Sequence, residues 1–212
     1  MNNKIRNQVL EKYKHSNKLH RKFTTFISNR KGFEIIENEV SKTGTILDLG
    51  CGHGYLCHYL SLTGKDRKII GLDNDPVKII EAGRSNDSNN VTFVLSDVTR
   101  NRLPDVDIVI VYCMLYQIPN HEKEDVIRKV YDCLNPNGMF IIREVENDDL
   151  LFTIKDYIRN LPVISLWRKM PTFKLYYPKK DYYKTILKDA GFNNIIKKDG
   201  CIIANKENGN EK

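Results

Sequence analysis

Leu47-Asp48-Leu49-Gly50-Cys51-Gly52-His53-Gly54 carries the strongest fold signal in this 212-residue chain. The apolar run 45–49 leads directly into three glycines within five residues. A short apolar run that stops at glycines indicates a buried strand followed by a tight turn. Glycine suits such a turn because it lacks Cβ and tolerates positive φ, so a ligand can approach the backbone. Open α/β sheets bind ligands at this place, beyond the carboxyl end of a strand.

Strand-like and helix-like patterns alternate after this turn. Asp75-Pro76 is a typical helix start, because Asp caps the first turn and Pro suits the first helical position. Asn135-Pro136-Asn137-Gly138 is typical of a turn, and Asp199-Gly200 predicts a hairpin turn. We expect strands at 45–49, 68–72, 91–95, 107–111, 139–142, 194–196 and 201–204, and helices at 55–62, 121–134, 181–190 and after Asp75.

The alternation defines the fold class. Uninterrupted apolar strands separated by helices indicate a parallel sheet that is covered on both faces. We therefore predict an α/β fold: a seven-stranded, doubly wound, mostly parallel sheet with an antiparallel C-terminal hairpin strand and helices on both faces. Residues 1–41 precede the first strand and are predicted to be helical, since their apolar residues recur at helical spacing.

Composition narrows the class of protein. The formal net charge is +7, and between Met1 and Lys31 nine Lys or Arg residues accompany one acid, Glu11. We interpret this excess as a solvated helix face, with an anionic binding surface as the alternative. No run approaches the roughly 20 apolar residues of a membrane span, and no apolar signal core follows the N-terminus. We expect a cytoplasmic protein.

The five cysteines do not form a recognisable framework. Their number is odd and no Cys-x-x-Cys pair occurs, so neither a disulfide scaffold nor a structural zinc site is expected. His53, Cys57 and His58 lack a convincing metal-ligand spacing, and we predict no metal site.

The glycine turn differs from a dinucleotide fingerprint. Gly-x-Gly-x-x-Gly cradles a pyrophosphate at a helix N-terminus, whereas here the third glycine comes one residue early and Tyr55 follows it. The segment 46–54 instead resembles motif I of the class I S-adenosylmethionine (SAM)-dependent methyltransferases. Three further segments resemble this family in the same order: 71–73, 95–98 and 107–119, with 134–138 matching its turn before strand 5.

The resemblance implies SAM as the cofactor and assigns residues to it. Asp73, which lies 23 residues after Gly50, would accept both ribose hydroxyls, and Asp97 would receive the adenine amino group. Other interpretations remain for the acids, since Asp48 could be a structural acceptor and Asp97 a loop cap. The predicted cofactor-binding residues are Asp48, Gly50, Cys51, Gly52, Gly54, Asp73, Asn74, Ser96, Asp97, Val98 and Tyr112.

The resemblance also predicts the domain organisation of the chain. We expect a single methyltransferase domain, 1–212. Its parts are a helical cap at 1–41, the SAM-binding core at 42–146, an insertion or lid at 147–180, the last helix and hairpin at 181–204, and a flexible tail at 205–212.

No catalytic residue is evident, because SAM itself carries the activated methyl group. A base is needed only if the acceptor must lose a proton. Tyr116-Gln117 occupies the place where many small-molecule enzymes of this family have a His pair. The remaining candidates are Tyr116 and Glu144, and Glu144 could instead pair with Arg143.

The acceptor is expected to be small or lipid-like, with methylation at oxygen. The insertion has an apolar helical stripe at 150–161, followed by Trp167 and Arg168-Lys169. It could pack on the sheet as a lid, line an acceptor pocket or contact a membrane surface peripherally. An RNA-modifying enzyme and a non-catalytic SAM-binding module are the alternatives. The chain lacks Asn/Asp-Pro-Pro-Tyr/Phe, which argues against N-methylation of adenine or glutamine. It has no evident RNA-binding appendage either, so we do not expect a nucleic-acid partner, and nothing in the sequence indicates the oligomeric state.

Overall fold

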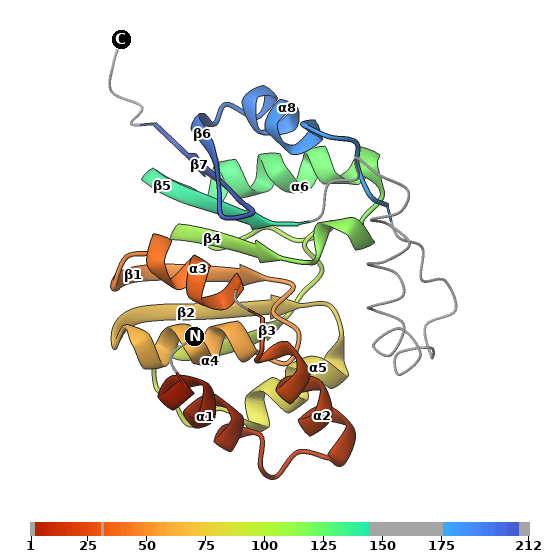
Figure 1. The fold of residues 1–212 in the computed structure, drawn as a ribbon. Helices are drawn as coiled ribbons and strands as arrows, with labels where there is room; N and C mark the ends of the chain where they lie inside the picture. The colour runs from red at the N-terminus through yellow and green to blue at the C-terminus, as the bar shows by residue number, and fades with distance from the viewer. Residues whose placement is uncertain (1–2, 31, 145–175, 208–212) are drawn as a thin grey trace.

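The computed structural model describes residues 3–30, 32–144 and 176–207. The described residues form a seven-stranded sheet in the order β3-β2-β1-β4-β5-β7-β6 (Figure 1). The first five strands are parallel, whereas β7 runs antiparallel to both β5 and β6. This arrangement confirms the predicted fold class. The strands are β1 Thr43–Leu49, β2 Asp66–Asp73, β3 Val91–Leu95, β4 Val106–Tyr112, β5 Leu134–Arg143, β6 Asn193–Lys198 and β7 Cys201–Asn205.

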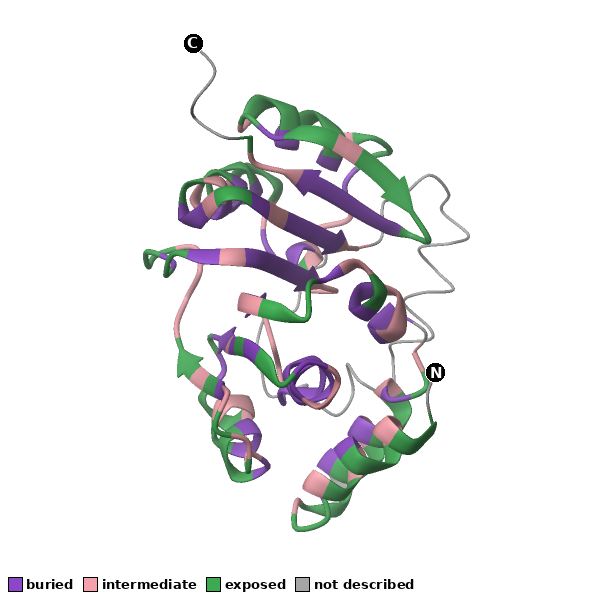
Figure 2. Ribbon diagram, turned by 90° about the vertical axis from the view of Figure 1, so that its left-hand side faces the viewer, coloured by how far each residue is buried: buried purple, intermediate pink, exposed green. Residues whose placement is uncertain are grey.

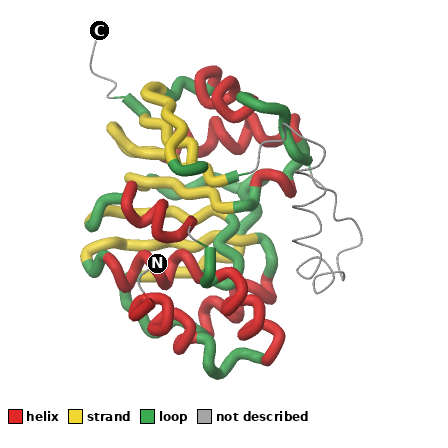
Figure 3. Tube along the Cα trace, in the orientation of Figure 1, coloured by secondary structure: helices red, strands yellow, loops and turns green. Residues whose placement is uncertain are grey.

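Helices cover the two faces of the sheet (Figure 3). Alternate residues of the central strands point to opposite faces, so Ile46 packs in one apolar cluster and Leu47 in the other. α1, α3 and α4 contribute to the Ile46 cluster, and α6 and α8 to the Leu47 cluster. The helices are α1 Asn3–Lys12, α2 Lys18–Ile27, α3 Gly32–Glu39, α4 Tyr55–Thr63, α5 Pro76–Arg84, η1 Leu115–Gln117, α6 Asn120–Cys133 and α8 Tyr182–Asp189.

Burial is concentrated in the central strands. Figure 2 shows buried residues in the middle of the sheet and an exposed outer strand, in agreement with β6, none of whose residues is buried. The predicted start of α5 is confirmed, because Asp75 Oδ1 accepts hydrogen bonds from the amides of Val77 at 2.9 Å and Lys78 at 3.3 Å. Pro76 occupies the first turn.

Two predicted boundaries are wrong. The expected turn at 135–138 lies inside β5 as an irregularity: Val106 pairs with Leu134 but Ile108 pairs with Met139, so four residues stand opposite Asp107. The Asn135 amide donates to Asp107 Oδ1 at 2.7 Å, which stabilises this irregular segment.

The predicted start of the flexible tail, residue 205, is also too early in the sequence. Asn205 belongs to β7, and the Lys206 ammonium donates to the carbonyls of Tyr131 and Leu134 at 2.8 and 2.7 Å. These carbonyls close the last turn of α6, where a cation is favourable.

The N-terminal residues form three helices, as their periodicity predicts. Val9 and Tyr13 are fully or almost fully buried against the α4 side of the sheet. The Tyr13 hydroxyl donates to the carbonyl of His53 at 2.6 Å, which connects the first helical region to the glycine turn.

One buried ion pair ties these helices to the sheet. Arg67 of β2 donates to Glu37 of α3 at 2.6 Å and to the carbonyl of Leu60 in α4 at 2.9 Å. Its side chain is completely buried. In the part of the chain that the structure describes, no helix is long and apolar enough to cross a membrane.

Candidate active site

The glycine turn follows β1 and wraps onto the end of β2. The amides of Gly50 and Cys51 both donate to the carbonyl of Leu72, at 2.7 and 3.0 Å. Gly52 has φ +57, and a Cβ there would meet no atom within 4 Å, so the backbone at this position faces open space. The turn therefore presents bare backbone, as a ligand-binding loop requires.

Asp73 joins this turn to the start of α5. Its Oδ2 accepts from the Gly52 amide and its Oδ1 from the Asp75 amide, both at 2.9 Å. The Lys78 ammonium lies 3.7 Å from Asp73 and 3.8 Å from Asp75. Each carboxylate oxygen can accept a further hydrogen bond, so Asp73 has acceptor capacity left for hydroxyl groups of a ligand.

Asp97 lies two residues beyond the end of β3, in the predicted segment 95–98, and its side chain caps its own loop. Its Oδ1 accepts from the amide and hydroxyl of Thr99 at 2.9 and 2.7 Å, and Oδ2 lies 3.5 Å from Arg100 Nε. The loop-cap interpretation thus holds, while Asp97 also lines the cavity described next.

A cavity of about 410 Å³ lies between these strand ends and the N-terminal helices. This size is within the range of small-molecule and cofactor sites. It brings together every predicted cofactor residue except Gly54, namely Asp48, Gly50, Cys51, Gly52, Asp73, Asn74, Ser96, Asp97, Val98 and Tyr112.

Gly54 does not line the cavity and has a packing role instead. It has φ +79, and a Cβ there would lie 2.4 Å from Cζ of Phe93 and 3.2 Å from Ala82. The absent side chain lets the start of α4 approach β3 and α5 closely.

Asp48 is the most buried acid of the site. The Cys57 thiol donates to its Oδ2 at 3.2 Å, and burial raises the pKa of Asp48 to about 7. Asp48 is therefore partly protonated near neutral pH and can donate as well as accept a hydrogen bond.

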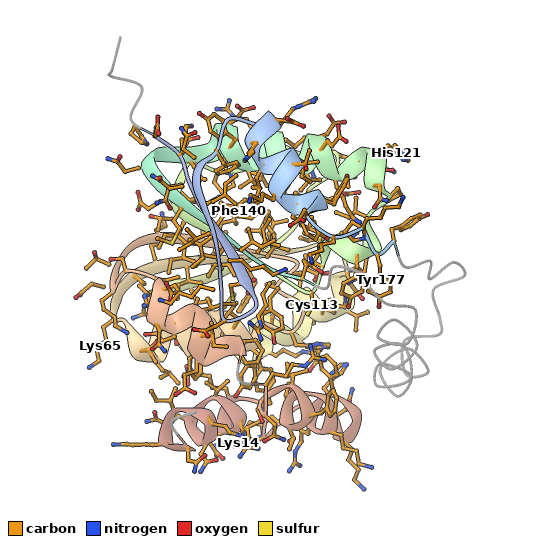
Figure 4. All side chains as sticks on the ribbon, turned by 45° about the horizontal axis from the view of Figure 1, so that its top comes forward. Lys14, Lys65, Cys113, His121, Phe140 and Tyr177 are labelled. Carbon is orange, nitrogen blue, oxygen red and sulfur yellow. The ribbon has the colours of Figure 1, made fainter. Side chains whose placement is uncertain are left out.

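β4 ends in an unusual backbone conformation. Cys113 follows the strand with φ +55, which is uncommon for a residue with a side chain, and its amide donates to the carbonyl of Arg143 at 2.9 Å. Figure 4 labels Cys113 and Tyr177, which lie toward the same end of the molecule, away from Lys65. Cys113 also lines the cavity.

Glu144 accepts hydrogen bonds from the segment that follows β4. Its Oε1 accepts from the amides of Leu115, at 2.6 Å, and Met114. Burial raises the pKa of Glu144 to about 7. It is not among the cavity-lining residues, and Arg143 donates instead to the Asp199 carbonyl at 2.7 Å. Glu144 thus fixes the segment after β4 by hydrogen bonds to its backbone, without lining the cavity.

Tyr116, the other catalytic candidate, does line the cavity. Its ring stacks on Tyr177 with centroids 5.7 Å apart, and its carbonyl accepts from the Tyr176 amide at 2.7 Å. Burial raises the pKa of Tyr116, which keeps the hydroxyl protonated at neutral pH.

The N-terminal helices contribute residues that the sequence analysis missed. Phe23 and Ile27 of α2, Arg30 after it and Phe33 of α3 all line the cavity. Phe23 and Ile27 are four residues apart in α2, which places them on one helical face. The other residues missed are His53, Tyr55, Leu56, Leu72, Asp75, Lys78 and Thr99. Cys113, Met114, Gln117 and Ile118 also line the cavity, and they belong to the segment 107–119 that resembles the family.

His53 is unsuited to proton transfer near neutral pH. Burial lowers its pKa to about 3, and its ring centroid lies 4.7 Å from that of His20. It is a neutral packing residue between the glycine turn and α2.

Comparison with known proteins identifies the family. A methyltransferase domain family matches residues 40–191, which is well over half of the chain. The chain belongs to this family. It is a class I, SAM-dependent methyltransferase domain, and SAM is the cofactor of this class. The exposed backbone at Gly52 and the remaining acceptor capacity of Asp73 fit a cofactor that carries hydroxyl and amino groups.

Relatives of this methyltransferase differ in what they act on. A carboxy-S-adenosyl-L-methionine synthase of Campylobacter concisus is 25% identical over 120 residues, which cover 56% of this chain and 51% of the relative. An (S)-coclaurine N-methyltransferase of Thalictrum flavum is 27% identical over 105 residues, covering 48% and 28%. The chain thus spans about half the length, or less, of these relatives.

A solved structure shows the same fold. Human N-acetylserotonin methyltransferase in complex with SAM superimposes with a TM-score of 0.69 at 19% identity. The match covers 96% of this chain and 57% of the human protein.

Proposed function

We propose that this protein binds SAM in the cavity and transfers its methyl group to an oxygen of a small, largely apolar acceptor. The single observation that carries the proposal is the bond between the Gly52 amide and Asp73 Oδ2, 2.9 Å long, at the edge of the cavity. It places a bare backbone turn and an acid side by side where open α/β sheets bind ligands.

The cofactor would lie across the ends of β1, β2 and β3. In this proposal Asp73 accepts the ribose hydroxyls and Asp97 receives the adenine amino group. Asp48 lies on the side of the methionine portion, where its raised pKa lets it share a proton with a polar group. The remaining proposed cofactor contacts are Gly50, Cys51, Gly52, Asn74, Ser96, Val98 and Tyr112.

The lining of the cavity also supports an apolar acceptor. Besides the proposed cofactor contacts it includes aromatic and aliphatic side chains from α2 and from the segment after β4: Phe23, Ile27, Tyr116 and Ile118. Apolar walls with few polar groups are typical of small-molecule sites. The segment 150–161 and Trp167, on which lipid-like acceptors and membrane contact depend, lie outside the described residues.

Transfer to an already ionised oxygen suits this lining. The described cavity residues from Tyr112 to Ile118 include no carboxylate and no histidine, and His53 is too weak a base. An acceptor that reaches the site as a carboxylate or phenolate needs no base to remove a proton.

Calorimetry with S-adenosylhomocysteine tests the cofactor site. Wild type should bind it, and Asp73→Asn should weaken binding about tenfold or more, because a charged acceptor is lost. Asp66→Asn is the matched control, since Asp66 is exposed at the other end of β2. No binding by wild type, or equal affinities in both variants, would contradict the proposal.

Methyl transfer from labelled SAM tests the acceptor. Small phenols and carboxylic acids should be methylated, whereas amines and bulk RNA should not. Labelled RNA would favour the RNA-modifying alternative, and no labelled product from any extract fraction would favour a non-catalytic binding module.

Carboxy-S-adenosylmethionine is a second candidate ligand. The name of the Campylobacter relative supports it, and Arg30, a cation in the cavity wall, provides a suitable partner for an additional carboxylate. Competition calorimetry would test it: tighter binding of carboxy-S-adenosylmethionine than of SAM favours this candidate, and weaker binding excludes it.

A further inference from the structure

The two edges of the sheet differ in their protection against pairing with a further strand. β3 and β6 are the outermost strands of the described sheet and lie at its opposite ends (Figure 1). β6 contains Lys197 and Lys198 and has a register shift between Asn193 and Ile196. Lysines and irregularities of this kind protect natural edge strands. β3, with the sequence Val-Thr-Phe-Val-Leu, has no charged residue, no proline and no register shift.

Two residues of β3 direct their backbone groups away from the sheet. The Ser96 amide donates to the Asp73 carbonyl at 3.0 Å, which sets the alternation of the β2–β3 ladder. Every second residue of β3 bonds to β2, so the amides and carbonyls of Phe93 and Leu95 point to the outer side. In the part of the chain that the structure describes, no hydrogen bond satisfies these groups.

The side chains beside this edge are apolar and exposed. Val94 is 40% exposed and Leu95 54%. The neighbouring helix α5 also exposes Val77 and Ile80. These four residues are most of the large apolar side chains that are exposed in the described ranges. Such a concentration is typical of an interaction site.

The available backbone groups restrict how a strand can be added. On the N-terminal side of Phe93, the Val91 carbonyl already accepts from the Asn86 side-chain amide at 2.9 Å, and the Val91 amide donates to the Ser88 carbonyl at 3.5 Å. An added strand therefore finds its partners within β3 at Phe93 and Leu95.

A second copy of β3 satisfies these groups in one antiparallel register. With a two-fold axis at Val94, each Phe93 exchanges both of its backbone hydrogen bonds with Leu95 of the other copy. The two Val94 side chains then face each other across the axis, as a pair without direct backbone hydrogen bonds. The edge is complementary to itself.

The charges that flank β3 agree with this register. Asp87, whose side chain is 74% exposed, precedes the strand, and the exposed Arg100 and Arg102 follow it. About the axis, the Asp87 end of one copy lies toward the arginine end of the other. Unlike charges thus approach each other at both ends of the strand pair, which favours association.

We propose that β3 pairs with β3 of a second copy of this chain, forming a two-fold symmetric dimer in which one sheet continues through both copies. The inference does not depend on the proposed function, because the β3 edge uses no residue of the cofactor site. A strand pair of this length buries less surface than a standard interface, so the dimer is weak, with a dissociation constant on the order of micromolar or above.

Sedimentation equilibrium of the whole chain tests the dimer. Wild type should show a reversible monomer–dimer equilibrium. Val94→Lys places like charges opposite each other at the axis and should weaken the dimer about tenfold or more. Ile196→Lys is the matched control, since Ile196 is exposed on the other edge strand, and it should retain the wild-type equilibrium.

Mixing two variants tests the register. Val94→Lys and Val94→Glu should each be monomeric where wild type dimerises, and an equimolar mixture should dimerise again, because unlike charges then meet at the axis. Val94→Cys should form a disulfide-linked dimer when oxidised glutathione is added. Thr92→Cys, which lies opposite Ser96 in this register, should form none beyond the wild-type level.

Three results would overturn the proposal. One is a wild type that stays monomeric up to about 0.1 mM. Another is a dimer that Ile196→Lys weakens as much as Val94→Lys does. The third is protection of the Phe93 and Leu95 amides from hydrogen exchange in a monomer, which would assign the edge to another segment of the same chain. Val94→Lys should bind S-adenosylhomocysteine with the affinity of wild type, which shows that the variant is folded.

Discussion

Glu144 Oε1 lies 2.6 Å from the amide nitrogen of Leu115, and the same oxygen also accepts from the Met114 amide. A buried carboxylate at the end of β5 therefore fixes the segment that leaves β4. Because that segment supplies Met114 and Tyr116 to the cavity wall, Glu144 shapes the wall without lining it.

Removal of this carboxylate should destabilise the fold. Glu144→Ala leaves two amides without their acceptor, which costs about 1–3 kcal/mol. Glu144→Gln retains an acceptor oxygen and should cost less. Urea unfolding measures both, with Glu124→Ala on the exposed side of α6 as the control. Equal stabilities of Glu144→Ala and the control would refute the positioning role.

Acid should destabilise the protein through a buried histidine. Burial lowers the pKa of His58 to about 4, from an ordinary value of 6.5. Below pH 6.5 the unfolded chain takes up a proton that the folded chain resists, so this contribution is present above pH 6.5 and is lost as the pH falls toward 4.

His58→Leu should remove this dependence. The free energy of unfolding should fall less steeply between pH 6.5 and 4.5 than in wild type, by at most about 1.4 kcal/mol per pH unit. His121→Leu removes an exposed histidine and should retain the wild-type slope. Identical slopes for wild type and His58→Leu would show that His58 is not held neutral.

The buried pair of Arg67 and Glu37 should be costly to break from one side. Glu37→Ala leaves an uncompensated buried guanidinium and is expected to cost about 3–5 kcal/mol. Arg84→Ala breaks the partly exposed pair with Glu81 and should cost about 1 kcal/mol or less. Urea unfolding of Glu37→Ala, Arg67→Leu and the double variant tests this, because the double variant should be more stable than Glu37→Ala.

Two glycine-to-alanine substitutions should change the free energy of unfolding in opposite directions. Gly54→Ala places a methyl group 2.4 Å from the Phe93 ring at positive φ, and should destabilise by about 1–3 kcal/mol. Gly83→Ala lies within α5 with no atom within 4 Å of the new Cβ, and should stabilise by about 0.5–1 kcal/mol. Thermal unfolding of both variants checks the signs, and a stable Gly54→Ala protein would contradict the tight packing at α4.

Local signals made much of this fold predictable. The Asp75-Pro76 helix start and the strand ends at Asp73 and Leu95 follow from residues that are neighbours in sequence. The irregularity at 135–138 could not be predicted from the sequence, because it depends on how β5 pairs with β4 around Asp107.

The lining of the cavity was predictable at the strand ends and less so elsewhere. The contact between Glu144 and Leu115 joins residues 29 positions apart. Arg30 reaches the cavity only because α2 docks over the glycine turn, where the ring of Phe23 lies 5.3 Å from that of His53. Docking of this kind depends on tertiary packing that periodicity does not reveal.

The double attachment of Asp73 has an evolutionary consequence. One carboxylate fixes the Gly52 amide and the first residues of α5 while facing the cavity. A substitution of Asp73 that altered the preference of the cavity for its ligand would also remove hydrogen bonds that hold the glycine turn and the start of α5. Changes in ligand preference should therefore arise more easily in the cavity-lining side chains of α2 and of the end of β4. A side chain there can be replaced without loss of the hydrogen bonds that hold the glycine turn.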